Sequence, residues 1–254
     1  MFIDPASLST DPSKIEEVEK ASARLVAQAI YEFRQTAAEI FAREKDLAQD
    51  IAEDITREAL DRLGVSRMDL RLFGKIDYKR ARYVFHPEYA VRQALFVDSK
   101  AEKESGTATL QTAQTSLRIR HVRSGADVDE PGELPIVVES EKGNCLTTSM
   151  VVKYHYSDEP ASKLLEIIIA AVPNGMLQGT YNPTAADTIW RTGRNAPTRG
   201  EVFRVRLLFS ALKSRMKWRV QNVQVPDVAS APEPGPTLAS GGSPLGADVF
   251  PWDE

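Results

Sequence analysis

The sequence predicts an α/β fold in which a central mixed β-sheet is flanked by helices and preceded by an N-terminal helical segment. Residues 12–63 repeat apolar side chains at the three- and four-residue spacing of a helix. Several later runs alternate apolar and polar residues, which is the period of a half-buried strand. The run LLEIIIAAV at 164–172 is the most hydrophobic in the chain, and it predicts a strand in the interior.

The helical segment has clear boundaries. Asp11 followed by Pro12 is a typical helix start, and Gly64 is a typical stop. The apolar repeat is interrupted near 45–49, which predicts two helices rather than one. Residues 1–66 carry 14 acidic against 8 basic side chains, so this part of the surface is acidic.

A hairpin is expected after the helices. FGKIDYKRARYVF (73–85) alternates and predicts a strand, HPEYAV predicts a turn, and RQALFVDSK (92–100) returns as a second strand. The segment 101–132 is polar, with a helical or irregular piece expected around 106–117. Further strands are expected at 134–138, 149–157, 164–172 and 201–209, followed by a short helix at 210–217.

Composition excludes several classes of protein. The single cysteine, Cys145, rules out an intrachain disulfide and a multi-cysteine zinc site, and suits a reducing cytoplasm. The three histidines, His86, His121 and His155, are scattered, so a His-rich metal centre is not expected. No stretch has the long apolar character of a membrane span, and the first residues lack a signal-peptide pattern.

The candidate chemistry lies at the end of the second hairpin strand. Because side chains alternate across a strand, Asp98 and Lys100 emerge on one face. Pairing across the turn brings Asp77 toward Asp98, and two adjacent carboxylates repel unless a cation lies between them. Oxygen ligands favour Mg²⁺, and Lys100 could position a water that attacks a phosphodiester. A solvated hairpin edge with ordinary salt bridges also fits this spacing.

Several motifs resemble one known family. AEDITREALDRLG (52–64), the two hairpin strands, TLQTAQ (109–114), TYNP (180–183) and TRGEVFRVRL (198–207) look like the corresponding segments of SfiI-like type II restriction endonucleases. VPNG (172–175) is similar to a stretch of the related BglI enzymes. The resemblance spans roughly residues 15–220 in the same order, and it implies a nuclease core of the PD-(D/E)xK superfamily.

The resemblance also implies a site and an activity. It assigns the metal-binding carboxylates to Asp77 and Asp98, a further ligand to the backbone carbonyl of Ser99, and the catalytic lysine to Lys100. Glu53 is either a second contact around the metal or an exposed helix acid. The implied activity is Mg²⁺-dependent cleavage of double-stranded DNA at an interrupted, GC-rich palindrome by a homodimer or homotetramer.

The basic segment 191–219 is the part of the chain that we expect to contact DNA bases. Residues 191–219 carry nine Lys or Arg against one Glu. Arg204 and Arg206 share one strand face, and arginine suits the guanine edge in the major groove. Further candidate DNA contacts are Arg194, Arg199, Gln111 and Gln114. Alternatively, the arginines pair with the acidic N-terminal helices, and the glutamines belong to a polar surface helix.

The expected organisation is a single restriction-endonuclease domain over 1–225 followed by a tail over 226–254. In the tail, 13 of 29 residues are Pro, Gly or Ser, which predicts a mobile tail or an extended docked arm. A rival to the enzyme is a non-catalytic, sequence-specific DNA-binding protein derived from a nuclease. Both hypotheses, the nuclease and the non-catalytic protein, predict that the chain binds double-stranded DNA.

Overall fold

The computed structural model describes residues 2–44, 47–64, 81–139, 143–158, 162–193, 204–228 and 249–254. Its α-helices are α1 (Pro12–Arg43), α2 (Ala48–Arg62), α3 (Gln178–Tyr181) and α4 (Phe209–Arg215). Short 3-10 helices are η1 (Pro5–Thr10), η3 (Thr112–Gln114), η4 (Gly175–Leu177) and η5 (Lys217–Arg219). The strands are β1 (Ala81–His86), β2 (Val91–Glu102), β3 (Thr107–Gln111), β4 (Ile119–Arg123), β5 (Ala126–Glu130), β6 (Val137–Val138), β7 (Cys145–Ser157), β8 (Lys163–Val172), β9 (Trp190–Thr192), β10 (Arg204–Leu208) and β11 (Val220–Gln224).

The large sheet is mixed, as the sequence predicts. Its strand order is β1-β2-β7-β8-β11, with β6 paired to β7. Strands β2 and β7 run parallel, and the other neighbours run antiparallel. The predicted hairpin is β1 and β2, which pair from Ala81 opposite Phe96 to His86 opposite Val91. Two smaller sheets, β3-β10-β9 and β4-β5, complete the fold.

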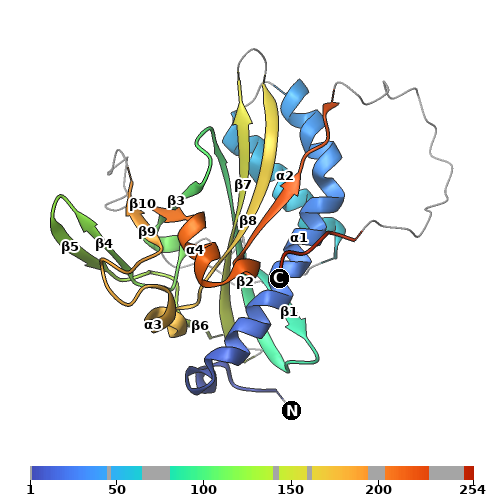
Figure 1. Ribbon diagram of the computed structural model, residues 1–254. Coiled ribbons are helices and arrows are strands. Elements are labelled where there is room, and N and C mark those ends of the chain that lie inside the picture. The colour runs from blue at the N-terminus through green and yellow to red at the C-terminus, as the bar shows by residue number, and fades with distance from the viewer. Residues whose placement is uncertain are drawn as a thin grey trace.

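The large sheet separates two hydrophobic cores. Helices α1 and α2 cover one face, while the smaller sheets and α4 lie on the other side (Figure 1). Along β8, Ile167, Ile169 and Ala171 pack toward the helices, whereas Ile168 and Ala170 pack toward the smaller sheets. This two-sided burial explains why the strand sequence is apolar almost throughout.

The predicted break in the helical segment is confirmed. The carboxylate of Asp11 accepts a hydrogen bond from the Lys14 amide at 3.2 Å, which caps α1, and Pro12 occupies the first helical position. Helix α1 ends at Arg43 and α2 starts at Ala48. Within the described residues, no helix is long and apolar enough to cross a membrane.

The middle of the chain contains strands that the sequence did not predict. The segment 106–117, expected to be helical or irregular, contains strand β3 followed by the short helix η3 (Thr112–Gln114), and β4 and β5 form a second hairpin in a polar stretch for which no strand was predicted. Strand β3 pairs with β10, about a hundred residues later in the chain, with Leu110 opposite Val205. A short polar strand that pairs with such a distant partner carries little local sequence signal, so the sequence did not predict β3 as a strand.

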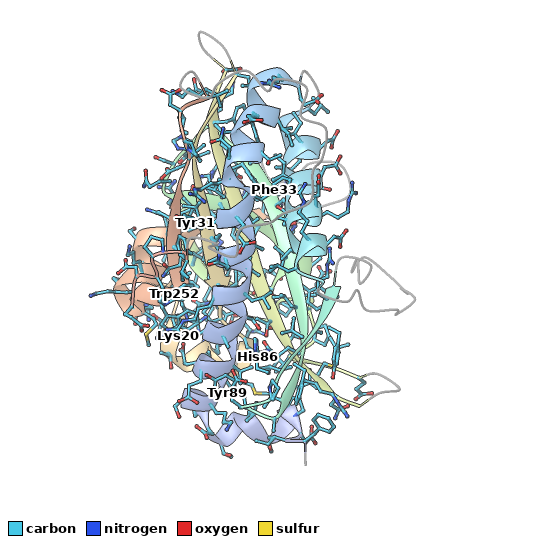
Figure 2. All side chains as sticks on the ribbon, turned by 90° about the vertical axis from the view of Figure 1, so that its right-hand side faces the viewer. Lys20, Tyr31, Phe33, His86, Tyr89 and Trp252 are labelled. Atoms are coloured by element: carbon cyan, nitrogen blue, oxygen red, sulfur yellow. The ribbon has the colours of Figure 1, made fainter. Side chains whose placement is uncertain are left out.

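The last six residues pack against the body of the protein. Phe250 is buried and lies 5.5 Å from the ring of Tyr31 on α1. Its amide donates to Gln28 at 2.9 Å, and Gln221 on β11 exchanges two hydrogen bonds with the backbone of Asp253. Figure 2 shows Trp252 beside α1, between Lys20 and Tyr31. These residues therefore form a docked arm, and the surface that receives it belongs to the same chain.

Candidate active site

Strand β2 places Asp98 and Lys100 on one face, as the alternation of the sequence predicts. The Asp98 Oδ2 and Lys100 Nζ atoms are 2.9 Å apart, and each side chain keeps 15% of its surface exposed. Parallel pairing with β7 continues past both residues to Glu102 opposite His155, so the backbone that carries the pair is fixed. The carboxylate and the amine are thus partly desolvated but still reachable from outside.

An open pocket of about 470 Å³ surrounds this pair. Its wall is built by α2, β2, β3, η3 and β10, which are distant in the sequence. The lining residues are Gln49, Glu53, Asp98, Lys100, Ala101, Glu102, Thr109, Gln111, Gln114 and Arg204. Six of the residues singled out in the sequence therefore meet in one place: Glu53, Asp98, Lys100, Gln111, Gln114 and Arg204.

The side chain of Gln114 contacts the Asp98 carboxylate. Its Nε2 donates to Asp98 Oδ1 at 2.8 Å, while its Oε1 accepts the Gln111 amide at 3.0 Å. The two oxygens of Asp98 thus face different groups, Gln114 on one side and Lys100 on the other.

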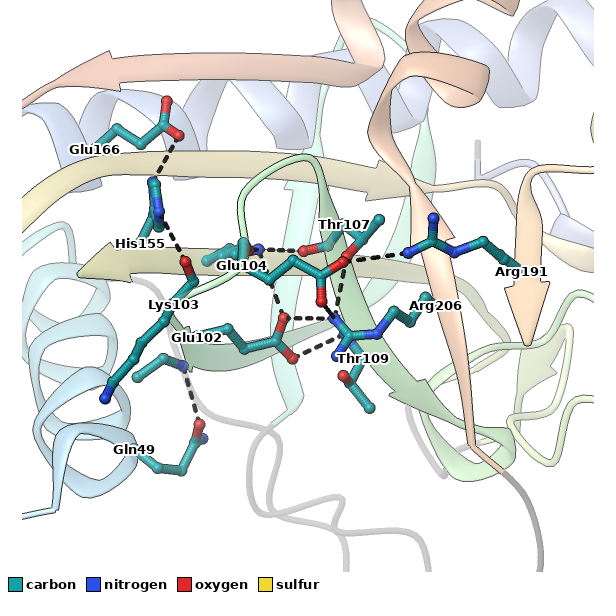
Figure 3. A network of polar contacts seen from close by, with 12 residues as sticks. Gln49, Glu102, Lys103, Glu104, Thr107, Thr109, His155, Glu166, Arg191 and Arg206 are labelled. Carbon is teal, nitrogen blue, oxygen red and sulfur yellow. Dashed lines mark hydrogen bonds and ion pairs between the residues drawn. The ribbon is translucent and has the colours of Figure 1, made fainter. Parts of the chain in front are cut away.

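Helix α2 contributes Gln49 to the backbone of β2. Its Nε2 donates to the Ser99 carbonyl at 2.7 Å and to Glu53 Oε1 at 3.0 Å, and its Oε1 accepts the Ala101 amide at 3.0 Å. Figure 3 shows Gln49 reaching β2 from the side of α2. Glu53, predicted either as a contact around the site or as an exposed helix acid, lies in the pocket and is linked to Ser99 through Gln49.

The Ser99 side chain points away from the pocket, toward the helices. Its hydroxyl donates to Thr56 Oγ1 at 2.8 Å, and Thr56 is also 2.8 Å from the Tyr154 hydroxyl. Burial raises the pKa of Tyr154 well above its ordinary value. This buried chain of hydroxyls fixes β2 against α2 while leaving the Ser99 carbonyl on the strand edge.

Arg206 is bonded to acidic residues at the end of β2. Its guanidinium lies 3.5 Å from Glu102 Oε2 and 3.3 Å from Glu104 Oε2, and it donates to the Thr107 hydroxyl at 3.1 Å (Figure 3). The sequence alternative, pairing with the N-terminal helices, applies to Arg219, which bonds Glu16 and Glu19 of α1. Within the basic segment, Arg206 therefore pairs with acids next to the candidate site, whereas Arg219 pairs with acids of α1.

A buried lysine lies beside the site on β7. Lys153 is opposite Lys100 in the ladder, has no exposed surface, and donates to the carbonyl oxygens of Glu104 and Thr107. Burial lowers the pKa of Lys153, and the Glu102 carboxylate at 3.5 Å opposes that shift. Lys153 thereby fixes the turn between β2 and β3.

Three predicted site residues, Asp77, Arg194 and Arg199, lie outside the described residues. Gln49, which lines the pocket, and Lys153, which is buried beside it, were not predicted from the sequence. Gln49 precedes Glu53 by four positions, a spacing that puts both on one face of a helix and offered a usable signal. Lys153 sits in an apolar strand with nothing in the local pattern to distinguish it.

The donors in the pocket suit a hard divalent cation. The carboxylate oxygens of Asp98 and Glu53 line the pocket, and the carbonyl of Ser99 belongs to the residue between the lining residues Asp98 and Lys100. These are the kinds of atom that Mg²⁺ prefers. Across the described residues, no group of three or more His, Cys, Asp or Glu is close enough to bind a metal without further ligands. Binding of a metal ion in the pocket therefore requires a backbone oxygen, water or a carboxylate from another part of the chain as a further ligand.

The fold is that of a restriction endonuclease. The structure superimposes on the tetrameric restriction endonuclease SfiI bound to cognate DNA with a TM-score of 0.77, 30% identity and 90% coverage of each chain. It also matches the restriction endonuclease BglI bound to its DNA recognition sequence, with a TM-score of 0.71 and 15% identity over 87% of this chain and 94% of that one. The second similarity concerns the fold alone.

The sequence comparisons identify the family. The family described as type II restriction enzyme SfiI matches residues 14–223. The type II restriction enzyme SfiI of Streptomyces fimbriatus is 33% identical over 239 residues, covering 88% of each chain. The chain belongs to the SfiI family of type II restriction enzymes, so it falls among the sequence-specific, DNA-cleaving hydrolases.

Proposed function

We propose that this protein hydrolyses phosphodiester bonds of double-stranded DNA in a Mg²⁺-dependent reaction at an interrupted, GC-rich palindrome. One observation carries the proposal. The pocket collects Asp98 and Lys100, 2.9 Å apart, with Gln111 and Arg204, which were predicted separately as DNA contacts. Carboxylate oxygens suited to a metal, an amine and an arginine suited to DNA lie in one open pocket, and metal-assisted phosphodiester hydrolysis needs these groups.

Asp98 and the Ser99 carbonyl would hold the metal together with Asp77. Asp77 precedes Ala81 by four residues, a distance of at most about 14 Å along an extended chain. Ala81 lies opposite Phe96, only two residues before Asp98. The connection is therefore short enough for Asp77 to act in this pocket.

Lys100 would orient the attacking water and stabilise its charge as the proton leaves. A bound divalent cation would supply positive charge to the phosphoryl oxygens and the leaving oxygen. The ammonium of Lys100 lies 2.9 Å from the Asp98 carboxylate, and the 15% of the side chain that is exposed leaves it accessible to substrate. This arrangement supports a direct role for Lys100 in the reaction.

Arg204 is the best-supported DNA contact of the basic segment, since it lines the same pocket and lies opposite Gln111 in the β3–β10 ladder. Arg206, Arg194, Arg199 and Gln114 remain predicted DNA contacts. We further propose a homodimer or homotetramer, because two identical subunits match the two halves of a palindrome. A cytoplasmic location suits a chain whose single cysteine, Cys145, is buried.

The test is cleavage of long, GC-rich DNA of known sequence with Mg²⁺ or with EDTA. We expect discrete fragments with Mg²⁺ only, and sequencing their ends gives the recognition site. Asp98→Asn and Lys100→Met should each reduce cleavage by at least about a hundred-fold. The matched control is the exposed pair Lys103 and Asp158, 2.5 Å apart, whose variants Lys103→Met and Asp158→Asn should cleave normally.

Metal-independent cutting would contradict the proposed chemistry. Full activity in Asp98→Asn would place the active site elsewhere. A protein that binds specific DNA but never cuts it would instead be a non-catalytic DNA-binding relative.

A further inference from the structure

We propose that Gln49 and Gln114 are positioning residues that orient the two oxygens of β2 that would bind the metal. This inference rests on the proposed function. Gln49 acts on the Ser99 carbonyl and Gln114 acts on Asp98 Oδ1. The two glutamines belong to different elements, α2 and η3, and they bond two consecutive residues of β2.

The orientation of the Gln49 carboxamide is fixed by its partners. Its Oε1 accepts the Ala101 amide, which can only donate, so its Nε2 must face the Ser99 carbonyl and Glu53. The carboxamide thus bonds the carbonyl of residue 99 and the amide of residue 101, as a neighbouring strand would. It holds the strand edge at the point where the proposed carbonyl ligand lies.

The same logic fixes Gln114. Its Oε1 accepts the Gln111 amide at 3.0 Å, so its Nε2 is directed at Asp98 Oδ1. This contact prevents rotation of the carboxylate, and Oδ2 stays toward Lys100 at 2.9 Å. Both amides are therefore locked by a backbone donor on one side and aimed at a candidate ligand oxygen on the other.

Such control matters because Mg²⁺ requires a nearly ideal octahedron with short metal–oxygen distances. Hydrogen bonds to ligand atoms orient those atoms, and their loss typically weakens metal binding by about ten- to a hundred-fold. The β2–β7 ladder holds the backbone at Ser99, but without the two glutamines the Asp98 carboxylate could rotate and the Ser99 carbonyl could tilt. The two glutamines remove that freedom before a cation arrives.

The chain offers a matched control on helix α1. Gln35 donates to Glu39 at 2.8 Å with the same four-residue spacing as Gln49 and Glu53. Gln35 is not among the residues that line the pocket. Gln35→Met therefore removes an equivalent helix bond without touching β2.

The experiment measures Mn²⁺ binding to the full chain without DNA, by the electron paramagnetic resonance signal of free Mn²⁺. Methionine keeps the length of glutamine and removes its polar atoms. We expect Gln49→Met and Gln114→Met each to raise the dissociation constant for Mn²⁺ by about ten-fold. Gln35→Met should bind Mn²⁺ as the wild type does, and circular dichroism should show that all the variants are folded.

Asp98→Asn separates this inference from the function on which it rests. If Asp98→Asn loses Mn²⁺ binding while the folded Gln49→Met and Gln114→Met bind it normally, the positioning roles are wrong and the metal site stands. If Asp98→Asn binds Mn²⁺ normally, the proposed metal site fails and the inference falls with it. A loss in only one glutamine variant assigns the role to that residue alone.

Discussion

Arg206 on β10 and Glu102 on β2 form an ion pair, with 3.5 Å between Nη1 and Oε2. Glu102 follows Lys100 by two residues on the same strand face, and its other oxygen accepts the Thr109 amide at 3.0 Å. The strand proposed to contact DNA is thus bonded directly to the strand that carries the candidate catalytic pair. The partly buried charges of Glu102 and Arg206 therefore join the two strands.

We expect this contact to couple the two strands energetically. A double-mutant cycle with Glu102→Gln and Arg206→Met should give a coupling of about 0.5–2 kcal/mol in the free energy of unfolding. The reason is that both side chains are only 17% exposed, so water screens their attraction poorly. The exposed pair Lys103 and Asp158 should give less than about 0.5 kcal/mol by the same measurement. Equal coupling energies in the two cycles would mean that the partly buried pair Glu102 and Arg206 stabilises the fold no more than an exposed pair does.

The buried hydroxyl groups of Ser99, Thr56 and Tyr154 predict that two small substitutions lower the free energy of unfolding by different amounts. Thr56→Val leaves both Ser99 Oγ and the Tyr154 hydroxyl without the partner they share, and it should destabilise the fold by about 1–3 kcal/mol. Ser99→Ala removes one donor and leaves Thr56 bonded to Tyr154, so its cost should be smaller. Urea denaturation measures both, and the reverse order would contradict the assigned bonding.

The buried cluster around Arg219 predicts a dependence of stability on pH. One guanidinium contacts the carboxylates of Glu16 and Glu19, so the cluster carries an excess negative charge until a proton binds. Glu19 is 1% exposed, and burial, opposed by the Arg219 charge, raises the pKa of Glu19 to about 7. The folded pKa is above the unfolded value of about 4.5, so the folded protein takes up a proton as the pH falls below about 7.

This linkage gives the sign of the effect. Stability from protonated Glu19 is fully present below about pH 4.5 and is lost as the pH rises through about 7. Compared with Glu19→Gln, the wild type should therefore lose about 1–3 kcal/mol between pH 5 and pH 8. Chemical denaturation across this range checks it. Parallel stability curves for the two proteins would show that Glu19 keeps an ordinary pKa.

The docked arm predicts a sharp contrast between neighbouring residues. Phe250→Ala should destabilise the protein by about 2–4 kcal/mol, because the ring is 6% exposed and packs among core residues of α1 and β11. Val249→Ala is the control: that side chain is 81% exposed, and its loss should change stability by less than about 0.5 kcal/mol. Similar, small effects of both substitutions, measured by thermal and urea unfolding, would show that the arm contributes little.

Several parts of the fold could be predicted because their signal is local. The two N-terminal helices follow from a long apolar repeat with a cap at Asp11, and the hairpin follows from alternation on each side of a turn. The adjacency of Asp98 and Lys100 needs only the two-residue period of β2. Their common face therefore follows from the sequence, whatever packs around the strand.

The arm and the smaller sheets could not be predicted in this way. A Pro- and Gly-rich tail gives no periodicity, so the burial of Phe250 depends on its packing against residues of α1 and β11. Strand β3 is short and polar, and its identity comes from pairing with β10 across about a hundred residues. Such elements are stabilised by distant partners, and their own residues carry no equivalent preference.

By itself, the sequence determined the residue types of the site and the strand face that carries two of them. Only the tertiary structure decided that Gln49, Gln114 and Arg204, from three other elements, converge on that face. The physical reason is that alternation along a strand is a property of neighbouring residues, whereas a pocket wall depends on how separate elements pack. Hydrogen bonds of 2.7–2.8 Å to Ser99 and Asp98 arise only once that packing is complete.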